Sequence, residues 1–293
     1  MAECNPDMTF SVVITSYNRP EYLVNAVRSV AEQEFSATEI VVVDDCSDFS
    51  VSELLEDFSQ LPLKIVTKRF RRGASHSRNL GIDHSSCDYI AFLDDDDAFM
   101  PQRLSYAAAL FARLPDCVAS LCSYQFMDGR ERRESPPSEW VDQEKLKKGN
   151  AYCGTSGLVI KTSVARLEKF DEEVPSGEDW ELFARLSQRC HFYYSNQPLF
   201  LYRVGNHASK TNQKKSLSIS QLEERFAAAN KQRTWLGEVN YLTKIATQIL
   251  GDLGSKQQIW QWVSFSLRKT GCLITAKVLF TLTVNKFARV LRY

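Results

Sequence analysis

The sequence lacks several features that would decide its class at once. It has no CxxC pair among its eight cysteines, no internal repeat, and no uncharged apolar run approaching the ~18 residues of a membrane-spanning helix. Unpaired cysteines and a polar N-terminus without a signal peptide predict a reducing, cytoplasmic location. Basic and acidic residues both total 36, so bulk charge argues against a nucleic-acid-binding protein.

Acidic residues are also missing from one long segment. Residues 253–293 hold seven basic residues and no acidic one, so the rest of the chain has seven more acidic than basic residues. The same segment is rich in apolar and aromatic residues, including Trp260 and Trp262. A cationic amphipathic helix of this kind suits an anionic membrane surface. The alternative is a helical hairpin packed on the rest of the chain, and both interpretations stand.

The first hundred residues alternate between two patterns. Short apolar runs predict strands at residues 10–15, 39–43, 63–67 and 89–93, and amphipathic or capped segments predict helices at residues 20–34, 51–58 and 73–83. Strands recurring at roughly the spacing of a βαβ repeat predict an α/β fold with a mostly parallel sheet flanked by helices.

The pattern changes after Pro101. A helix is predicted at 102–113, an apolar run at 117–126, a charged mobile excursion at 128–148, a strand at 154–161, a helix at 177–189, strands at 191–195 and 198–203, and helices from 217 onward. The predicted organisation is a catalytic domain over 1–214, with a nucleotide-binding half (about 9–100) and an acceptor half (about 101–214), followed by a basic helical extension over 215–293.

Polar residues follow three of the predicted strands. They are Thr15 to Asn18, the pair Asp44 and Asp45, and the run Asp94 to Asp97. In parallel sheets, ligands bind beyond the carboxyl ends of the strands. The three strand ends therefore predict one site of nucleotide size.

The four consecutive carboxylates of Asp94 to Asp97 carry the most chemical information. Two carboxylates about 4 Å apart repel by ~1 kcal/mol even in water. A cation that neutralises them explains their retention, and oxygen ligands favour a hard divalent ion such as Mg²⁺ or Mn²⁺. The alternative is a solvated acidic turn.

An ordered series of segments over residues 9–210 resembles the family 2 glycosyltransferases of the GT-A fold. The segments are Val13 to Asn18, Val42 to Ser47, Gly73 through Arg78 to Gly81, Phe92 to Asp97, Gly177 to Asp179, and Tyr202-Arg203. The resemblance implies transfer of a sugar from a nucleotide diphosphate donor, with inversion and a divalent metal. It differs at Cys46, where the family often has glycine.

The resemblance also implies roles for individual residues. Thr15, Tyr17 and Asn18 would lie along the base and ribose, and a carboxylate of the Asp44-Asp45 pair would accept a hydrogen bond from the base. The alternative for that pair is a helix-capping turn. Arg78 would reach the nucleotide with its guanidinium. The basic run from Lys68 to Arg72 is interpreted as a solvated loop, with steering of an anionic donor as the alternative.

For the metal, the resemblance places the DxD motif on Asp94 and Asp96. Asp96 would be the direct ligand, and Asp94 or Asp95 would reach the ribose or a metal-bound water. Asp97 receives no role. His207 is a further candidate ligand, because imidazole binds Mn²⁺.

For catalysis, the resemblance assigns Asp179 as the general base and Glu178 as its support. Inversion requires the acceptor hydroxyl to lose its proton on the face opposite the leaving group. Without the resemblance, an acidic pair opening a helix would be a helix cap.

The predicted protein is an inverting glycosyltransferase of the hexosyl- or N-acetylhexosaminyltransferase type. It would use a UDP-sugar and a glycan or lipid-linked saccharide acceptor in polysaccharide biosynthesis, peripherally at the inner face of the cell membrane. One alternative is a nucleotidyltransferase, although Thr15 to Pro20 lacks the glycine and lysine of a phosphate loop. The other is a non-catalytic nucleotide-sugar-binding protein.

Overall fold

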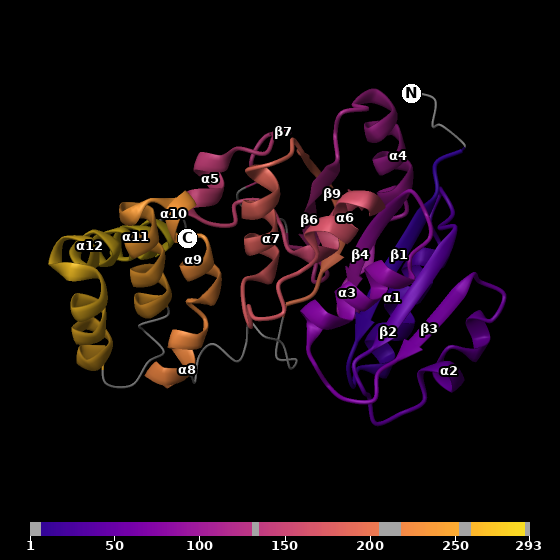
Figure 1. Ribbon diagram of the computed structural model, residues 1–293, viewed down its shortest axis with the longest axis horizontal. Helices are drawn as coiled ribbons and strands as arrows, with labels where there is room; N and C mark the ends of the chain where they lie inside the picture. The colour runs from indigo at the N-terminus through magenta and orange to yellow at the C-terminus, as the bar shows by residue number, and fades with distance from the viewer. Residues whose placement is uncertain (1–6, 131–134, 205–217, 252–258, 291–293) are drawn as a thin grey trace. The chain divides into compact units, whose positions relative to one another are not determined.

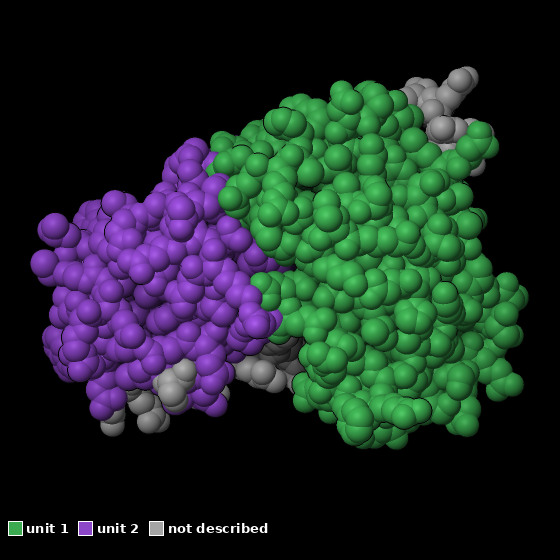
Figure 2. All heavy atoms as spheres, viewed as in Figure 1, with its two compact units in different colours: residues 1–143, 150–172, 182–205 green, residues 144–149, 173–181, 206–293 purple. Residues whose placement is uncertain are grey.

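The computed structural model describes residues 7–130, 135–204, 218–251 and 259–290. The chain forms two compact units, coloured separately in Figure 2. The first comprises residues 1–143, 150–172 and 182–205, and the second comprises residues 144–149, 173–181 and 206–293. The predicted domain boundary at residue 214 lies outside the described residues and stays a proposal.

A nine-stranded sheet forms the first unit (Figure 1). Its strands are β1 (Phe10–Ser16), β2 (Glu39–Asp44), β3 (Leu63–Thr67), β4 (Tyr89–Asp94), β5 (Ala98–Phe99), β6 (Ala119–Phe126), β7 (Glu139–Trp140), β8 (Val159–Lys161) and β9 (Tyr193–Tyr202). The order is β3-β2-β1-β4-β8-β6-β9-β5, with β7 also paired to β9.

The sheet is mixed. The four strands β3, β2, β1 and β4 are mutually parallel, as predicted from their spacing. Beyond β4, antiparallel pairs attach β8 to β4 and β6, and attach β5 and β7 to β9, while β6 and β9 are parallel. The register aligns Thr15 of β1 with Val43 of β2 and Asp94 of β4, so the three polar strand ends share one edge of the sheet.

Helices and short turns connect these strands. In the first unit they are α1 (Pro20–Ala31), α2 (Val51–Leu54), η1 (Glu56–Phe58), α3 (Ala74–His84), α4 (Arg103–Arg113), η2 (Thr155–Gly157) and α6 (Thr162–Glu168). The helix α3 contacts both β1 and β2. Gly81 permits this close packing, because a Cβ there would lie 2.3 Å from Cγ1 of Val13.

The core of the first unit is the apolar run of each central strand. Val12, Val13 and Ile14 of β1, and Val41 and Val42 of β2, are completely buried. Strands covered on both faces need apolar side chains at successive positions rather than alternating ones. Short runs of β-branched residues therefore predict the central strands of the sheet.

The second unit is helical. It contains most of α5 (Gln143–Lys148), the first turn of α7 (Glu178–Ser187), and α8 (Ile219–Glu224), α9 (Ala227–Lys231), α10 (Arg233–Leu236), α11 (Glu238–Leu250) and α12 (Ile259–Val290). Gly271, with φ of +79°, interrupts α12 and divides it into two halves. The helical extension predicted from the sequence is confirmed. Within the described residues no helix combines the length and the hydropathy needed to cross a bilayer.

Three predictions in the second half of the chain are wrong. The strand predicted at 154–161 is limited to β8, because Thr155–Gly157 form the turn η2. The excursion at 128–148 contains β7 and α5, because Leu146 is completely buried and its carbonyl accepts a hydrogen bond from the Trp180 indole at 2.7 Å. The two strands predicted at 191–195 and 198–203 form one strand, β9, which pairs with β6 through irregular register near Cys122 and Ser123. The short strand β5 and the helix α6 were not predicted.

Candidate active site

Carboxylates cluster where β4 ends. Asp94, Asp96 and Asp97 each present an oxygen within 4.8 Å of the others. Three carboxylates at this spacing are a donor set that fits a hard divalent cation. The structure therefore brings together the predicted metal ligands Asp94 and Asp96, and it adds Asp97. The third predicted ligand, His207, lies outside the described residues.

Guanidinium groups flank the cluster. Arg78 on α3 donates to Asp94 at 2.7 Å. Arg19, which precedes α1, donates to Asp95 at 2.8 Å and to Asp96 at 2.9 Å. Arginine forks match carboxylate geometry and remain charged at any physiological pH. The repulsion among the carboxylates is thus partly neutralised by the protein itself.

Two of the four carboxylates point inward and hold the site together. Asp95 accepts hydrogen bonds from the Ser16 hydroxyl at 3.0 Å and the Tyr17 backbone N–H at 3.3 Å, which joins β4 to the end of β1. Burial raises the pKa of Asp95 to about 6, the charges of Arg19 oppose that rise, and the neighbouring carboxylate of Asp96 adds to it. The predicted contact of Asp95 with a ribose or a metal-bound water stays a prediction.

Asp97 joins the site to more distant segments. Its carboxylate accepts hydrogen bonds from the Ser156 hydroxyl of η2 at 2.7 Å and from the Arg203 backbone N–H at 3.0 Å. The side chain of Arg203 also donates to the carbonyl of Asp96 at 3.0 Å. Burial, together with the charges of Asp94 and Asp96, raises the pKa of Asp97 well above its usual value.

The end of β1 is shaped by contacts to the loop after β2. Asn18 has φ of +51°, donates to the Asp48 carboxylate at 2.7 Å and accepts from the Asp48 backbone at 2.8 Å. These bonds fix the loop beside Thr15 and Tyr17. The Tyr17 ring carries the Arg71 guanidinium 4.1 Å from its centroid. The nucleotide contacts predicted for Thr15, Tyr17 and Asn18 remain predictions.

The acidic pair after β2 organises turns. The Asp44 carboxylate accepts from the Ser47 backbone N–H at 3.1 Å. The Asp45 carboxylate accepts from the backbone N–H groups of Arg72 and Gly73, both at 2.9 Å, and pairs with the Lys68 ammonium. These bonds position the loop that leads into α3. A contact of either carboxylate with a nucleobase remains a prediction.

One interpretation of the basic run before α3 is wrong. Lys68 is buried, because its ammonium pairs with Asp45 and donates to the Ser77 hydroxyl at 3.2 Å. Arg69, Arg71 and Arg72 are exposed, as expected of a solvated loop. Sequence patterns could not single out Lys68, because its partner lies 23 residues earlier in the chain.

Asp179 and Glu178 open α7 in the second unit. Glu178 is buried, and Asp179 accepts a hydrogen bond from the Trp180 backbone N–H at 2.7 Å. Lys244 of α11 lies over the Trp180 ring, 3.4 Å from its centroid. Burial lowers the pKa of Lys244 to about 8, and the charge of Asp179 opposes that change. The assignment of Asp179 as general base stays a prediction.

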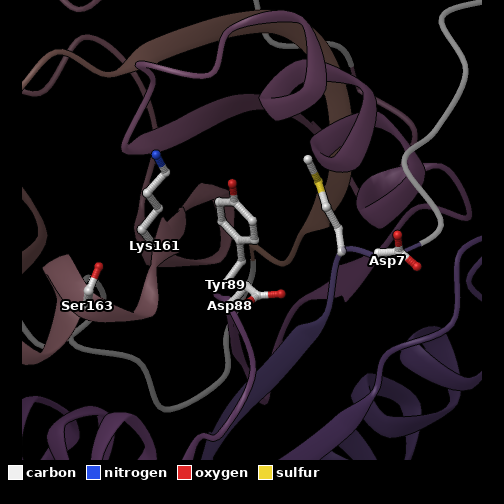
Figure 3. Close-up of a pocket in the computed structure, with 6 residues that line it drawn as sticks. Asp7, Asp88, Tyr89, Lys161 and Ser163 are labelled. Atoms are coloured by element: carbon white, nitrogen blue, oxygen red, sulfur yellow. The ribbon is translucent and has the colours of Figure 1, made fainter.

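A hollow of about 390 Å³ lies away from these residues (Figure 3). It is lined by Asp7, Met8, Asp88, Tyr89, Lys161 and Ser163. Tyr89 is the first residue of β4, whereas the carboxylate cluster follows its last residue. The hollow therefore borders the opposite edge of the sheet and contains none of the predicted site residues.

Parallel strands whose carboxyl ends carry converging acidic and cationic side chains place the protein in the class of α/β proteins that bind ligands at the carboxyl ends of their strands. Comparison with known families narrows this class. The model of a family described as "Glycosyl transferase family 2" matches residues 11–173, more than half of the chain. The chain belongs to this family. That membership argues against the nucleotidyltransferase alternative.

Curated relatives include glycosyltransferases of bacterial polymer synthesis. The poly(ribitol-phosphate) beta-N-acetylglucosaminyltransferase TarS of Staphylococcus aureus (strain Mu50) is 33% identical over 220 residues, covering 69% of this chain and 37% of TarS. The amylovoran biosynthesis glycosyltransferase AmsB of Erwinia amylovora is 27% identical over 213 residues, covering 68% of this chain and 70% of AmsB. Across such relatives the chain spans from 27% to 85% of their length.

Solved structures confirm the GT-A fold. The structure of S. aureus TarS 1–349 in complex with UDP-GlcNAc has a TM-score of 0.63 at 21% identity, covering 93% of this chain and 72% of that one. The mannosyltransferase PcManGT of Pyrobaculum calidifontis, in complex with GDP-Man and Mn²⁺, has a TM-score of 0.59 at 15% identity. This match covers 97% of this chain and 82% of the mannosyltransferase chain. At these identities the likeness concerns the fold.

Proposed function

We propose that the protein is an inverting glycosyltransferase that moves a hexosyl or N-acetylhexosaminyl group from a nucleotide diphosphate sugar to a glycan or lipid-linked saccharide. The observation that carries this proposal is the carboxylate cluster after β4, formed in a chain that belongs to glycosyl transferase family 2. The cluster shares a sheet edge with the polar ends of β1 and β2.

The donor side of the site consists of these polar strand ends. Thr15, Tyr17 and Asn18 would lie along the base and ribose, with Asp44, Asp45 and Arg78 as further nucleotide contacts. TarS has been solved with UDP-GlcNAc and with UDP, and the mannosyltransferase with GDP-Man. We favour a UDP-sugar, because the TarS match joins sequence similarity to likeness of fold.

Asp94, Asp96 and Asp97 would hold a divalent cation, Mn²⁺ or Mg²⁺, since all three offer carboxylate oxygens. When bound, the cation would neutralise the charge that builds on the departing diphosphate. Arg19 donates to the carboxylate of Asp96 and Arg203 donates to its backbone carbonyl, so both parts of this residue are held in place. Asp95 holds the strand end against β1, so the cluster is preorganised before donor binding.

Asp179 would act as the general base, with Glu178 supporting the loop. The carboxylate would take the proton of the acceptor hydroxyl as its oxygen attacks the anomeric carbon. The bond from that carbon to the diphosphate oxygen breaks at the same time, and the nucleoside diphosphate leaves with the electron pair. A single displacement inverts the anomeric centre.

The acceptor would be a glycan or a lipid-linked saccharide in a polysaccharide pathway. Two proteins that resemble this chain support this proposal. AmsB is named for amylovoran biosynthesis, and TarS is named for the transfer of N-acetylglucosamine to poly(ribitol-phosphate). A lipid-linked acceptor would require the enzyme at the inner face of the cell membrane. We propose that it associates there peripherally through the basic extension.

The test is calorimetric binding of UDP to the purified protein, with and without Mn²⁺. Metal-dependent binding is expected for the wild-type protein. Asp96→Ala should lower the affinity for UDP by at least about 10-fold in the presence of Mn²⁺, because a direct ligand is lost and even outer-shell changes cost about 10- to 100-fold in metal affinity. The matched control is Asp116→Ala, which removes an exposed acidic residue of the same unit and should bind as the wild type does.

Unchanged UDP affinity in Asp96→Ala would refute the metal role. If no member of a panel of nucleoside diphosphates bound with either metal, the donor site itself would be wrong. If UDP bound and no sugar was transferred from any UDP-sugar, the protein would be a nucleotide-sugar-binding protein without catalysis.

A further inference from the structure

Both halves of α12 leave large apolar side chains in solvent. Ten large apolar residues in the described part of the chain are classed as exposed, and six of them lie on this helix. The six are Ile259, Trp260, Leu267, Leu273, Phe280 and Val284. Soluble proteins seldom gather exposed apolar residues in this way unless the surface binds something.

The second half of α12 carries apolar residues on two opposite sides. Leu273, Phe280 and Val284 are exposed, and their spacing of seven and four residues places them on one side of the helix. Val278 and Thr275 are buried on the opposite side. The helix therefore has two apolar sides, of which one packs within the unit and the other faces solvent.

The first half of α12 repeats the arrangement before the interruption at Gly271. Trp260 is 83% exposed and Leu267 is 43% exposed, seven residues apart on one side. Trp262 and Phe265 are buried on the other. We call the exposed residues Trp260, Leu267, Leu273, Phe280 and Val284, with Arg268 and Lys277, the outer face of α12.

The charge of the outer face has one sign. Arg268 and Lys277 are exposed beside the apolar residues, and residues 253–293 contain no acidic side chain. Lys269 is already paired, since its ammonium lies 2.6 Å from the Glu223 carboxylate. Exposed basic residues beside aromatic and aliphatic ones match a surface that is both anionic and apolar.

We propose that the outer face of α12, formed by its two halves, binds the anionic surface of a phospholipid bilayer at the level of the head groups. This inference rests on the peripheral location proposed above and assigns that location to named residues. It also reconciles the two interpretations of the basic segment, because each half of α12 packs one side within the second unit and presents the other side to the lipid.

A second copy of the chain is a poorer occupant of this face. Pairing two outer faces would bring Arg268 and Lys277 of one copy toward those of the other. Like charges across an interface are unfavourable unless acidic partners separate them, and residues 253–293 supply none. The charge pattern therefore favours lipid.

The test is co-sedimentation of the full chain with vesicles of phosphatidylcholine, and with mixed vesicles of phosphatidylcholine and phosphatidylglycerol. The wild-type protein should bind the mixed vesicles and not the neutral ones. The double variant Leu273→Ser/Phe280→Ser should lower the partition coefficient roughly tenfold or more. The double variant Arg268→Gln/Lys277→Gln should weaken binding to mixed vesicles in low salt.

Matched controls lie outside α12. Phe70→Ser/Leu167→Ser removes two apolar side chains that are 77% and 79% exposed, close to the 83% and 72% of Leu273 and Phe280. Arg113→Gln/Lys148→Gln removes one exposed arginine and one exposed lysine outside α12. Both control variants should bind vesicles as the wild type does.

Failure of the wild type to bind mixed vesicles would overturn the inference, as would equal loss in the matched controls. A concentration-dependent dimer that disappears in Leu273→Ser/Phe280→Ser would overturn it in favour of a second copy. UDP binding without vesicles, measured on the same samples, reports the donor site separately. Loss of vesicle binding with normal UDP binding therefore leaves the proposed glycosyl transfer intact.

Discussion

At the scale of single residues, Cys46 has a backbone conformation that suits glycine better than cysteine. Its φ of +69° lies in the left-handed region, which costs a non-glycine residue about 1 to 2 kcal/mol. Cys46→Gly should therefore raise the free energy of unfolding by about 0.5 to 1 kcal/mol, after allowing for the greater freedom of glycine in the unfolded chain. Urea unfolding measures this difference.

The control for this prediction is Cys46→Ala. That variant removes the thiol, which makes only a long contact of 3.7 Å to the Arg69 carbonyl, and it keeps the unfavourable φ. Equal stabilisation by alanine and glycine would mean that the thiol, rather than the backbone, is the source of strain.

Asp179 is the residue on which the catalytic proposal depends. Asp179→Asn keeps the shape of the side chain and removes its basicity, so the transfer rate should fall by roughly 10²- to 10⁴-fold. Affinity for UDP should be unchanged, which separates a catalytic loss from a binding loss. Glu173→Gln is the matched control, because Glu173 is an exposed acid of the same unit. Normal turnover in Asp179→Asn would exclude it as the base.

At the scale of elements, α11 contacts the start of α7 through Lys244, whose ammonium lies over the Trp180 ring. The pKa of Lys244 is lowered by burial to about 8 from 10.5 in the unfolded chain. Between these values the unfolded chain holds the proton more tightly, so the free energy of unfolding rises with pH across that interval. Lys244→Met should abolish a rise of about 1 to 2 kcal/mol between about pH 7.5 and pH 9.5.

Urea unfolding at several pH values measures this slope. Lys148→Met replaces an exposed lysine of the same unit and should retain the wild-type slope. Adding Asp179→Asn to the wild-type chain should move the rise to lower pH, because the carboxylate that favours the ammonium is gone. An identical slope in Lys244→Met and the wild type would contradict the assignment.

Elements also show what sequence patterns can reveal. The strand β3 occupies Leu63–Thr67, as predicted, although none of its residues is fully buried; its β-branched residues favour an extended backbone, and it pairs with β2. The strands β5 and β7 have two residues each and exist only through pairing with β9. No local pattern can predict such strands, since their stability comes from a partner far along the chain.

At the scale of the whole molecule, the site residues that a local sequence pattern marks were predicted, and those brought in by distant parts of the chain were missed. Asp94 and Asp96 were predictable, because four consecutive carboxylates are conspicuous in any sequence. Arg19 and Ser156 were missed as parts of the site, although Arg19 bonds to Asp95 and Ser156 bonds to Asp97. Single arginine and serine residues are common, and only the folded sheet brings them to the end of β4.

The bonds to Asp97 have a consequence for how the protein folds. They join residues 59 and 106 positions apart in the sequence. Bringing such distant segments together carries a loop-closure cost in entropy, and contacts of this kind slow folding. Competence to bind a nucleotide should therefore arise late in refolding, after the first four strands have formed. A nascent chain would remain inert toward its donor until β9 had been synthesised and docked.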